Sequence, residues 1–391
     1  VRSGRTVTCN IGIYGEVVRG FYASAFSLLG SATAYPVINS AAFYLDDFPT
    51  PVPSGDATYI KRDYGMSIAG FYSKVWWPDL TKLAERYGIR FTGVMIENYG
   101  DDTKDAPVRQ KDESHFSYFG GLLLKQNGEI GYHGYNHQPL VLPNTDYGDE
   151  YAYHQWPNRK AVVASLRELI AFQKSVLPAA TASVYVPPSN ILSKEGRQTI
   201  GRDVPEIRTI ASTYLPSDSK LPYVQEFGVA DDGIVEAPRI VSGGMVGDYM
   251  RLAAESELNM HFVSTHFMHP DDMLDPDRGA KEGWAVYRKG LENYLDWLEA
   301  SAPSIRMQTG TECASAVQRF SGLTVKMRES ANEWEFDLGN FKDQAWLLLR
   351  ANHGTPGRIQ GGSMIRMTGN LYLIKATDSA VHVERKAGGA A

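Results

Sequence analysis

Short apolar runs alternate with helix-like patterns through the middle of the chain. Ala41–Leu45 and Ile89–Ile96 have the length and composition of buried strands. Arg159–Val176 and Trp284–Leu298 carry apolar residues three and four positions apart, which is the spacing of a helix with one buried face. Strands that alternate with helices predict an α/β domain over residues 36–320, with enough units for a barrel; an open doubly wound sheet is the alternative. Further strands are expected in this region at Glu129–Tyr132, Ser183–Val186, Ile207–Ser212, Ile234–Val241, Leu258–Thr265 and Ile305–Gln308.

The pattern changes towards both ends of the chain. After Phe320 only short strand-like runs remain, separated by Gly, Asn and Asp, so residues 321–391 predict a small β-sandwich-like domain. Residues 1–35 hold one strand-like run and a helix-like stretch over Phe21–Leu29. We expect them to be a lead-in, or the end of a preceding domain.

Composition excludes some classes of partner. The net charge is −6, and there is no run of basic residues of the kind that a phosphate backbone selects, so nucleic acid is not an expected partner. No stretch approaches the roughly 18 consecutive apolar residues of a transmembrane segment. The two cysteines, Cys9 and Cys313, cannot make a disulfide framework. The chain opens at Val1 rather than Met, so an export signal could lie outside it.

Polar residues gather where the predicted strands end. Asp46 and Asp47 follow one strand, the pair His133 and His137 follows another, and a histidine follows Leu258–Thr265. In α/β folds the loops at the carboxyl ends of the strands converge over one rim, where sites are built. Each of these residues also has an ordinary explanation, because Asp-Asp before a proline is common turn chemistry and a single histidine often only bonds a carbonyl.

The spacing of the histidine pair suits a metal ion. Two imidazoles four residues apart can meet one ion, and Gly134 permits close backbone approach between them. Two histidines with one carboxylate leave a coordination position open for water, which is typical of a catalytic rather than a structural zinc site. A histidine at a further strand end is suited to act as a general acid near neutral pH.

These residues resemble a known family. Leu45–Pro49 (LDDFP), Gly131–His137 (GYHGYNH) and the late strand-end histidine resemble the motifs of NodB-homology polysaccharide deacetylases, carbohydrate esterase family 4. The phrases WWPD, HQPL and PPSN look like the divergent group linked to exopolysaccharide and galactosaminogalactan deacetylation, carbohydrate esterase family 18. The resemblance covers residues 41–319 and implies a distorted (β/α)7–8 barrel, followed here by the small C-terminal β-sandwich-like domain.

Roles follow from the resemblance residue by residue. It implies that Asp47, His133 and His137 ligate one divalent ion, with Zn²⁺ the first choice, that Asp46 is the general base, and that a strand-end histidine is the general acid. Because it follows the predicted strand directly, His266 is favoured for this role over His269. The family's arginine motif, which orients the base, is absent, and we assign its role to Arg239. The predicted substrate contacts are Tyr135, Asn136, Asn190 and His269.

The resemblance implies metal-dependent removal of N-acetyl groups from an amino-sugar polysaccharide containing GalNAc or GlcNAc, such as a biofilm exopolysaccharide. A secreted or cell-surface location is expected with such a substrate. One alternative is a non-catalytic carbohydrate-binding protein with a degenerate site. Another is a deacetylase of a different zinc type that uses the segment His269–Asp272 (HPDD). A glycosidase that uses Asp46 and Asp47 fails on geometry, since its two carboxylates must flank a bond about 5 Å or more apart.

Overall fold

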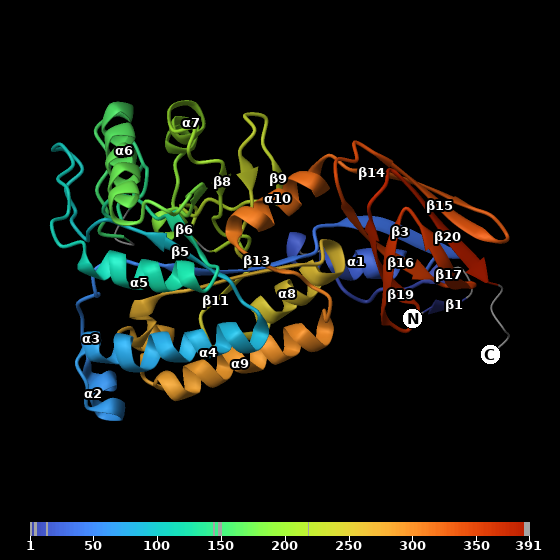
Figure 1. Cartoon of the computed structure of the whole chain (residues 1–391), viewed down its shortest axis with the longest axis horizontal. Helices are drawn as coiled ribbons and strands as arrows, with labels where there is room; N and C mark the ends of the chain where they lie inside the picture. Colours follow the sequence, from blue (N-terminus) through green and yellow to red (C-terminus); the bar gives the residue numbers. More distant parts are fainter. Residues whose placement is uncertain are drawn as a thin grey trace.

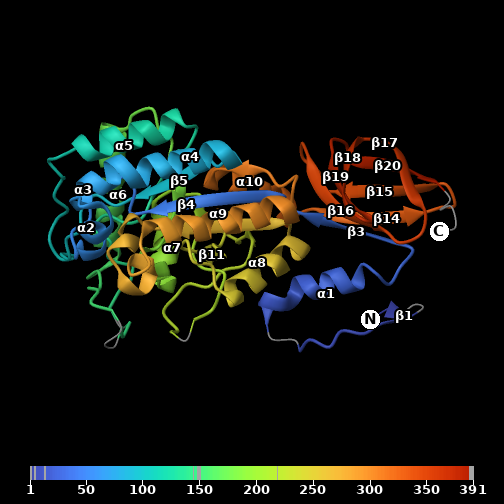
Figure 2. The same cartoon turned by 90° about the horizontal axis from the view of Figure 1, so that it is seen from below.

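A computed structural model describes residues 2–3, 6–12, 15–143, 145–147, 151–217 and 219–386. It contains a curled sheet with surrounding helices and, beside it, an antiparallel β-sandwich (Figures 1 and 2). The helices are α1 (Arg19–Phe26), α2 (Thr58–Tyr64), α3 (Ile68–Phe71), α4 (Trp77–Tyr87), α5 (Ser114–Lys125), α6 (Arg159–Val176), α7 (Lys194–Asp203), α8 (Asp248–Met260), α9 (Trp284–Ser301) and α10 (Gly310–Ser321).

The curled sheet is parallel over most of its width and carries the expected strand–helix alternation. Its central strands are buried throughout, as expected when helices cover a parallel sheet. Only β9 runs antiparallel, beside β10, and β13 (Met307–Gln308) pairs with the first part of β4. The strand order is β11 (Val241–Ser242), β12 (Val263–Met268), β4 (Ser40–Asp46), β5 (Phe91–Met95), β6 (Glu129–Tyr132), β7 (Val184–Tyr185), β8 (Thr209–Ile210), β10 (Val235–Glu236) and β9 (Gly228–Val229).

The predicted barrel is only partly formed. Among the residues that the structure describes, no strand pairing joins β11 to β9, so the sheet is an open half-barrel rather than a closed one. Helix α10 contacts β4 on one side and β9 and β10 on the other. Its first turn is tied to the sheet, because Gly310 N donates to Thr92 Oγ1 and Thr311 N donates to Glu129 Oε1, both at 2.8 Å. The helix thus packs against β4 and against the edge of the open sheet that β9 and β10 form.

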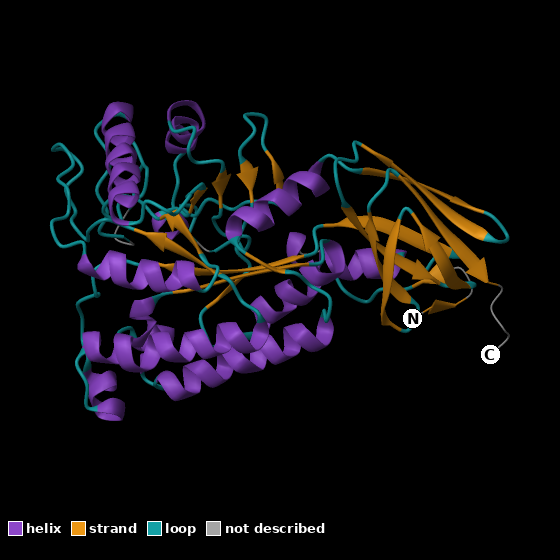
Figure 3. Cartoon of the chain, viewed as in Figure 1, coloured by secondary structure: helices purple, strands orange, loops and turns teal. Residues whose placement is uncertain are grey.

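The C-terminal β-sandwich is two antiparallel sheets of four strands each (Figure 3). The first contains β14 (Thr324–Glu329), β15 (Glu333–Gly339), β20 (Ala380–Lys386) and β17 (Thr355–Gln360). The second contains β18 (Gly362–Thr368), β19 (Leu371–Ala376), β16 (Ala345–Ala351) and β3 (Ala32–Val37). Strand β3 comes from the amino-terminal side of the half-barrel and pairs with β16 along its full length. The lead-in region and residues 321–391 therefore share one sheet, whereas α1 packs on α8.

In the sheet containing β16, strands β16 and β19 are largely buried on both faces, whereas β18 is partly exposed. Leu347 and Leu349 enter the core between the two sheets, whereas Leu348 belongs to the core cluster of the half-barrel. The sandwich is thus joined to the half-barrel by packed apolar side chains. No described helix combines the length and apolar character that a membrane crossing requires.

Most predicted elements are confirmed, but several differ. The structure divides Ile234–Val241 into β10 and β11, and it adds elements that the pattern did not predict, among them β3, β9, β17, α2, α7 and α10. The predicted strand Leu258–Thr265 is wrong at both ends, because α8 continues to Met260 and β12 runs from Val263 to Met268. This last shift moves the site histidine, as described below.

Candidate functional site

The end of β4 directs two adjacent carboxylates to different partners. Asp46 is the last residue of the strand, and Asp47 follows with a positive φ of 54°, in the left-handed region that few non-glycine residues adopt. Adjacent residues on a regular strand point to opposite faces, so this change of backbone conformation allows both side chains to lie at the rim. Positive φ values recur nearby, a cluster typical of functional sites. They occur at His137, Ser189 and Asn190.

The structure brings Asp47, His133 and His137 together. The Nε2 atoms of both histidines lie 3.8 Å from Asp47 Oδ1, and the three ligand atoms are mutually within 4.8 Å. His133 follows β6 directly, and its backbone N–H donates to Met95 O on β5, which fixes the start of the loop. The grouping that the sequence predicted is therefore present at the rim, with His133 buried and His137 partly exposed.

The donor atoms of this group suit a divalent cation. Asp47 Oδ1 and His133 Nε2 are buried and have no hydrogen-bond partner. His133 Nδ1 donates to Val186 O at 2.8 Å, so the lone pair of the neutral ring lies on Nε2. Burial lowers the pKa of His133 to about 3, which keeps the ring neutral, and burial raises the pKa of Asp47. A cation between these atoms would satisfy both orphaned groups and offset the desolvation of the carboxylate.

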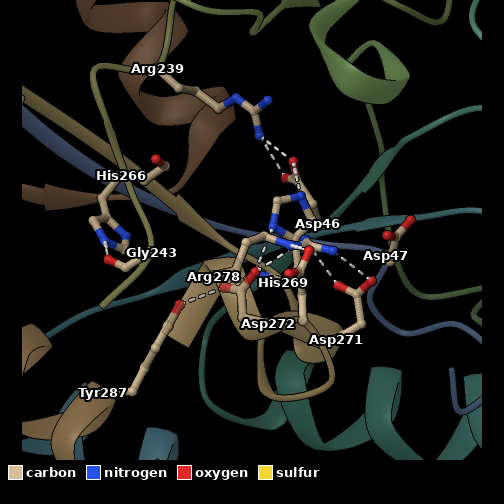
Figure 4. A network of polar contacts seen from close by, with 12 residues as sticks. Asp46, Asp47, Arg239, Gly243, His266, His269, Asp271, Asp272, Arg278 and Tyr287 are labelled. Atoms are coloured by element: carbon tan, nitrogen blue, oxygen red, sulfur yellow. Dashed lines mark hydrogen bonds and ion pairs between the residues drawn. The ribbon is translucent and has the colours of Figure 1, made fainter. Parts of the chain in front are cut away.

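Asp46 forms a buried ion pair with Arg239. Arg239 Nη1 lies 2.6 Å from both carboxylate oxygens (Figure 4). Arg239 Nη2 donates to Asn190 Oδ1 at 2.6 Å. The guanidinium also lies over the Phe267 ring, 4.0 Å from its centroid. Burial would raise the pKa of Asp46, but Arg239 and the nearby His133 and His269 hold it below its usual value. Arg239 thus contacts Asp46 as the sequence predicted, and Asn190 contacts this arginine.

His269 lies between two carboxylates. Its Nε2 is 3.6 Å from Asp46 Oδ2, and its Nδ1 is 3.3 Å from Asp272 Oδ1. Burial would lower its pKa, but Asp272, with Asp46 and Asp271, raises it to about 9. The imidazole is therefore protonated at neutral pH, with one N–H directed at Asp46.

His266, the predicted general acid, lies elsewhere. Because β12 runs to Met268, His266 is a mid-strand residue rather than the first residue at the rim. Its ring packs between Phe43 and Tyr294, and its Nε2 is bonded to Gly243 O at 2.7 Å (Figure 4). Burial lowers its pKa to about 4, so it is neutral at physiological pH. The first histidine beyond the strand is His269, and the structure places that residue beside Asp46.

The predicted substrate contacts Tyr135 and Asn136 are used within the protein. The Tyr135 hydroxyl donates to Val108 O at 2.8 Å and accepts from Val108 N at 2.7 Å. Asn136 Nδ2 donates to Asp102 O at 2.7 Å. Both side chains therefore hold the segment 102–108 against the histidine loop, and both are buried.

The HPDD segment brings a cluster of charged side chains to the rim, and the structure shows which residues they contact. His269, Asp271 and Asp272 lie close enough to share a cation. Arg278 supplies that positive charge, since its guanidinium contacts Asp271, Asp272 and Asp275 at 2.9–3.3 Å. Tyr287 on α9 adds a hydrogen bond to Asp272 Oδ2 at 2.5 Å. Sequence reasoning named Asp272 only within the alternative HPDD zinc motif, and it missed Arg278 and Tyr287 as site residues. Of these three residues, only Asp272 could have been linked to His269 from the sequence, because it lies three positions after that histidine.

The fold and the rim define a class of protein: an α/β half-barrel whose strand ends bring two histidines and one carboxylate together as a candidate cation site, beside an aspartate paired with an arginine. The chain belongs to the bacterial family described as "uncharacterised protein conserved in bacteria (DUF2194)", whose model matches residues 1–373. No curated protein shows a significant match to the chain.

Several solved structures are similar to part or most of the chain. One is a putative polysaccharide deacetylase from Mycobacterium smegmatis, with 16% identity and a TM-score of 0.43 over 72% of this chain and 91% of that chain. Another is a BA3943 mutant, described as a CE4 family pseudoenzyme with restored enzymatic activity, with 11% identity and a TM-score of 0.37 over 72% and 69%. A third is a GH30 endoxylanase from Clostridium papyrosolvens, with 9% identity and a TM-score of 0.34 over 91% and 98%. Because each TM-score is below 0.5, the functional proposal rests on the site geometry.

Proposed function

We propose that this protein is a metal-dependent hydrolase that removes N-acetyl groups from an amino-sugar polysaccharide. The observation that supports this most directly is the convergence of Asp47 Oδ1 and the two Nε2 atoms, two of these three atoms being buried without a hydrogen-bond partner. Two histidines and one carboxylate form a ligand set that leaves room for water. A divalent ion held there would act as a Lewis acid and lower the pKa of a bound water from 15.7 towards 7.

Asp46 is the general base in this proposal. Its carboxylate is ionised over the neutral range because Arg239 holds its pKa low, and it lies next to Asp47 in the chain. It accepts the proton of the water that attacks the acetyl carbonyl. Arg239 and Asn190 hold the carboxylate in place during this transfer, since the guanidinium contacts both Asp46 oxygens and the Asn190 amide oxygen.

His269 is the general acid in this proposal, in place of His266. An amine leaves an acetamide readily only when its nitrogen is protonated, so the reaction requires a proton donor on the sugar side. His269 is protonated at neutral pH, and its Nε2 faces Asp46, next to the position where the base acts. Asp272 accepts from the opposite ring nitrogen and keeps Nε2 directed at the reaction centre. The base and the acid thus have different proton affinities because their charged neighbours have opposite signs.

Metal content and acetate release test the proposal. We expect the protein, stripped with a chelator and reloaded, to bind one Zn²⁺ or similar ion and to release acetate from oligomers of N-acetylgalactosamine or N-acetylglucosamine. His137→Ala should weaken metal binding by more than the roughly 10- to 100-fold seen when an outer partner of a metal ligand is lost. His154→Ala is the matched control, because that ring bonds only the Asp101 carbonyl.

Two results would contradict the proposal. Metal uptake that is equal in the wild type and in His137→Ala would show that the three ligand atoms do not form the site. Binding of the oligomers without any acetate release, in the metal-loaded protein, would favour the carbohydrate-binding alternative.

A further inference from the structure

The Asp272 carboxylate is buried and holds more partners than a simple ion pair requires. Its Oδ2 accepts from the His269 backbone N–H at 3.0 Å and from the Tyr287 hydroxyl at 2.5 Å. Its Oδ1 is shared between His269 Nδ1 at 3.3 Å and Arg278 Nη1 at 3.1 Å (Figure 4). One oxygen is therefore held by neutral donors, and the other lies between two cations.

Tyr287 is held rigidly enough to fix the position of Oδ2. It projects from α9, is 1% exposed, and stacks on Trp284 with ring centroids 5.6 Å apart. The backbone lies directly against its ring on two sides. A Cβ added at Gly244 would lie 2.4 Å from the ring, and one added at Gly279 would lie 2.9 Å from it. Because the ring is closely packed on these sides, its hydroxyl is held against Asp272.

The hydroxyl is placed where it controls the orientation of the imidazole. His269 faces the carboxylates of Asp46, Asp271 and Asp272, while Arg239 and Arg278 pair with those carboxylates. His133 and Asp47 belong to the same rim. Rotation of the Asp272 carboxylate would break the contact between Oδ1 and Nδ1, and the ring would then be free to turn Nε2 away from Asp46. The Tyr287 hydroxyl opposes this rotation because it holds the other oxygen.

We infer that Tyr287 is a positioning residue for the reaction: its hydroxyl fixes Asp272, and Asp272 in turn keeps His269 Nε2 directed at the reaction centre. This inference rests on the proposed function, in which His269 delivers the proton to the leaving amine. Tyr287 does not touch the reacting atoms. Its hydroxyl also draws charge from Asp272, which lowers the proton affinity that this carboxylate confers on His269.

The same helix contains a matched control. Tyr294 is 2% exposed, and its hydroxyl is bonded to Ser264 Oγ at 2.8 Å, away from every charged residue of the site network described above. Tyr287→Phe and Tyr294→Phe therefore both delete one buried hydroxyl from α9 and keep the ring. We expect Tyr287→Phe alone to lower kcat about 10- to 100-fold, with KM and metal content unchanged. We also expect the pKa of His269 to rise in this variant, so that the high-pH limb of kcat/KM moves to higher pH.

Titration of the histidine rings by NMR separates this inference from the proposed function. The measurement uses the metal-free protein and follows the His269 ring signals against pH, without reference to activity. If the wild type releases no acetate, the proposed function fails, whereas a higher His269 pKa in Tyr287→Phe, and not in Tyr294→Phe, still supports the contact from Tyr287 to His269. An unchanged His269 titration, or equal kcat losses in the two variants, overturns the inference.

A second substitution covers the case in which Tyr287→Phe does not fold. Site-specific 3-fluorotyrosine at position 287 keeps the ring and the hydroxyl but makes the hydroxyl a stronger donor. The pKa of His269 should then fall rather than rise, and the high-pH limb should move to lower pH. No shift with the fluorinated residue, in a protein with wild-type thermal stability, would overturn the inference.

Discussion

At the scale of single residues, two adjacent aspartates have opposite electrostatic surroundings. Asp46 contacts an arginine and has a lowered pKa, whereas burial raises the pKa of Asp47, which lies beside the His133 and His137 rings. The two carboxylates have different partners because the positive φ of Asp47 turns its side chain away from that of Asp46. One carboxylate is thereby suited to accept a proton, and the other is suited to bind a cation.

The residue-scale prediction is a pH profile. Asp46 must be ionised, and its pKa lies below the usual value, so activity should fall only in acid. His269 must be protonated, a state present below its pKa of about 9, so activity should fall as pH rises through that value. Plots of kcat/KM against pH should therefore show a plateau from mildly acidic pH to about 9.

Substitutions of His269 and His266 test the assignment of this pH profile. His269→Gln should remove the high-pH limb and reduce the rate about 10²- to 10⁴-fold, the usual contribution of a general acid. His266→Gln should keep the wild-type profile, because that ring bonds only the Gly243 carbonyl. A high-pH limb centred near 6.5, the ordinary pKa of histidine, would contradict the assignment.

At the scale of elements, strand ends decide which residues reach the rim. The sequence predicted β4, β6, α6 and α9 well, because their apolar spacing is regular. It placed the end of β12 too early, since the apolar residues before Val263 belong to α8, and this error selected His266 instead of His269. Helix α10 was missed because its buried face is made mostly of small residues, which give a weak apolar pattern.

Some residues of the candidate site could be predicted from the sequence, and others could not. Asp47, His133 and His137 were predictable because each residue type has a known chemistry and follows a strand. Arg239 was assigned from the family resemblance, which implies an arginine that orients the base. Tyr287 had no such signal. It acts through a contact between α9 and the HPDD segment, and such a pairing depends on how the chain folds back on itself.

The element-scale prediction concerns the start of α10. A Cβ at Gly310 would lie 2.9 Å from the hydroxyl of the buried Tyr44 and 3.0 Å from Oε1 of Glu129, the half-buried first residue of β6. Gly310→Ala should therefore lower the free energy of unfolding by about 1–3 kcal/mol. Gly322→Ala, at the other end of the helix, meets open space and should change it by less than about 0.5 kcal/mol. Urea unfolding measures both, and equal effects would show that α10 is not packed tightly into the half-barrel.

At the scale of the whole molecule, the sandwich is a part of the fold and not a freely moving module. Its inner sheet packs against the second sheet on one face and against the half-barrel on the other. The contact with the half-barrel runs through Leu348 of β16 and Leu373 of β19, whereas β18 remains partly exposed.

The whole-molecule prediction is that the two parts unfold together. Leu348→Ala, at the boundary between sandwich and half-barrel, should lower the free energy of unfolding by about 2–5 kcal/mol in a single transition, followed by circular dichroism. Ile365→Ala is the control, because this residue of the same sheet is 48% exposed. Two separate transitions, of which Leu348→Ala shifts only one, would show that the sandwich is independent.

The position of β3 has a consequence for synthesis of the chain. This strand is made before the half-barrel, whereas β16, with which it pairs, emerges from the ribosome only after the entire half-barrel. Until then the hydrogen-bonding edge of β3 has no partner, a state prone to association with other chains. Nascent chains halted before β16 should therefore depend on chaperones, and release from that dependence should coincide with the arrival of β16.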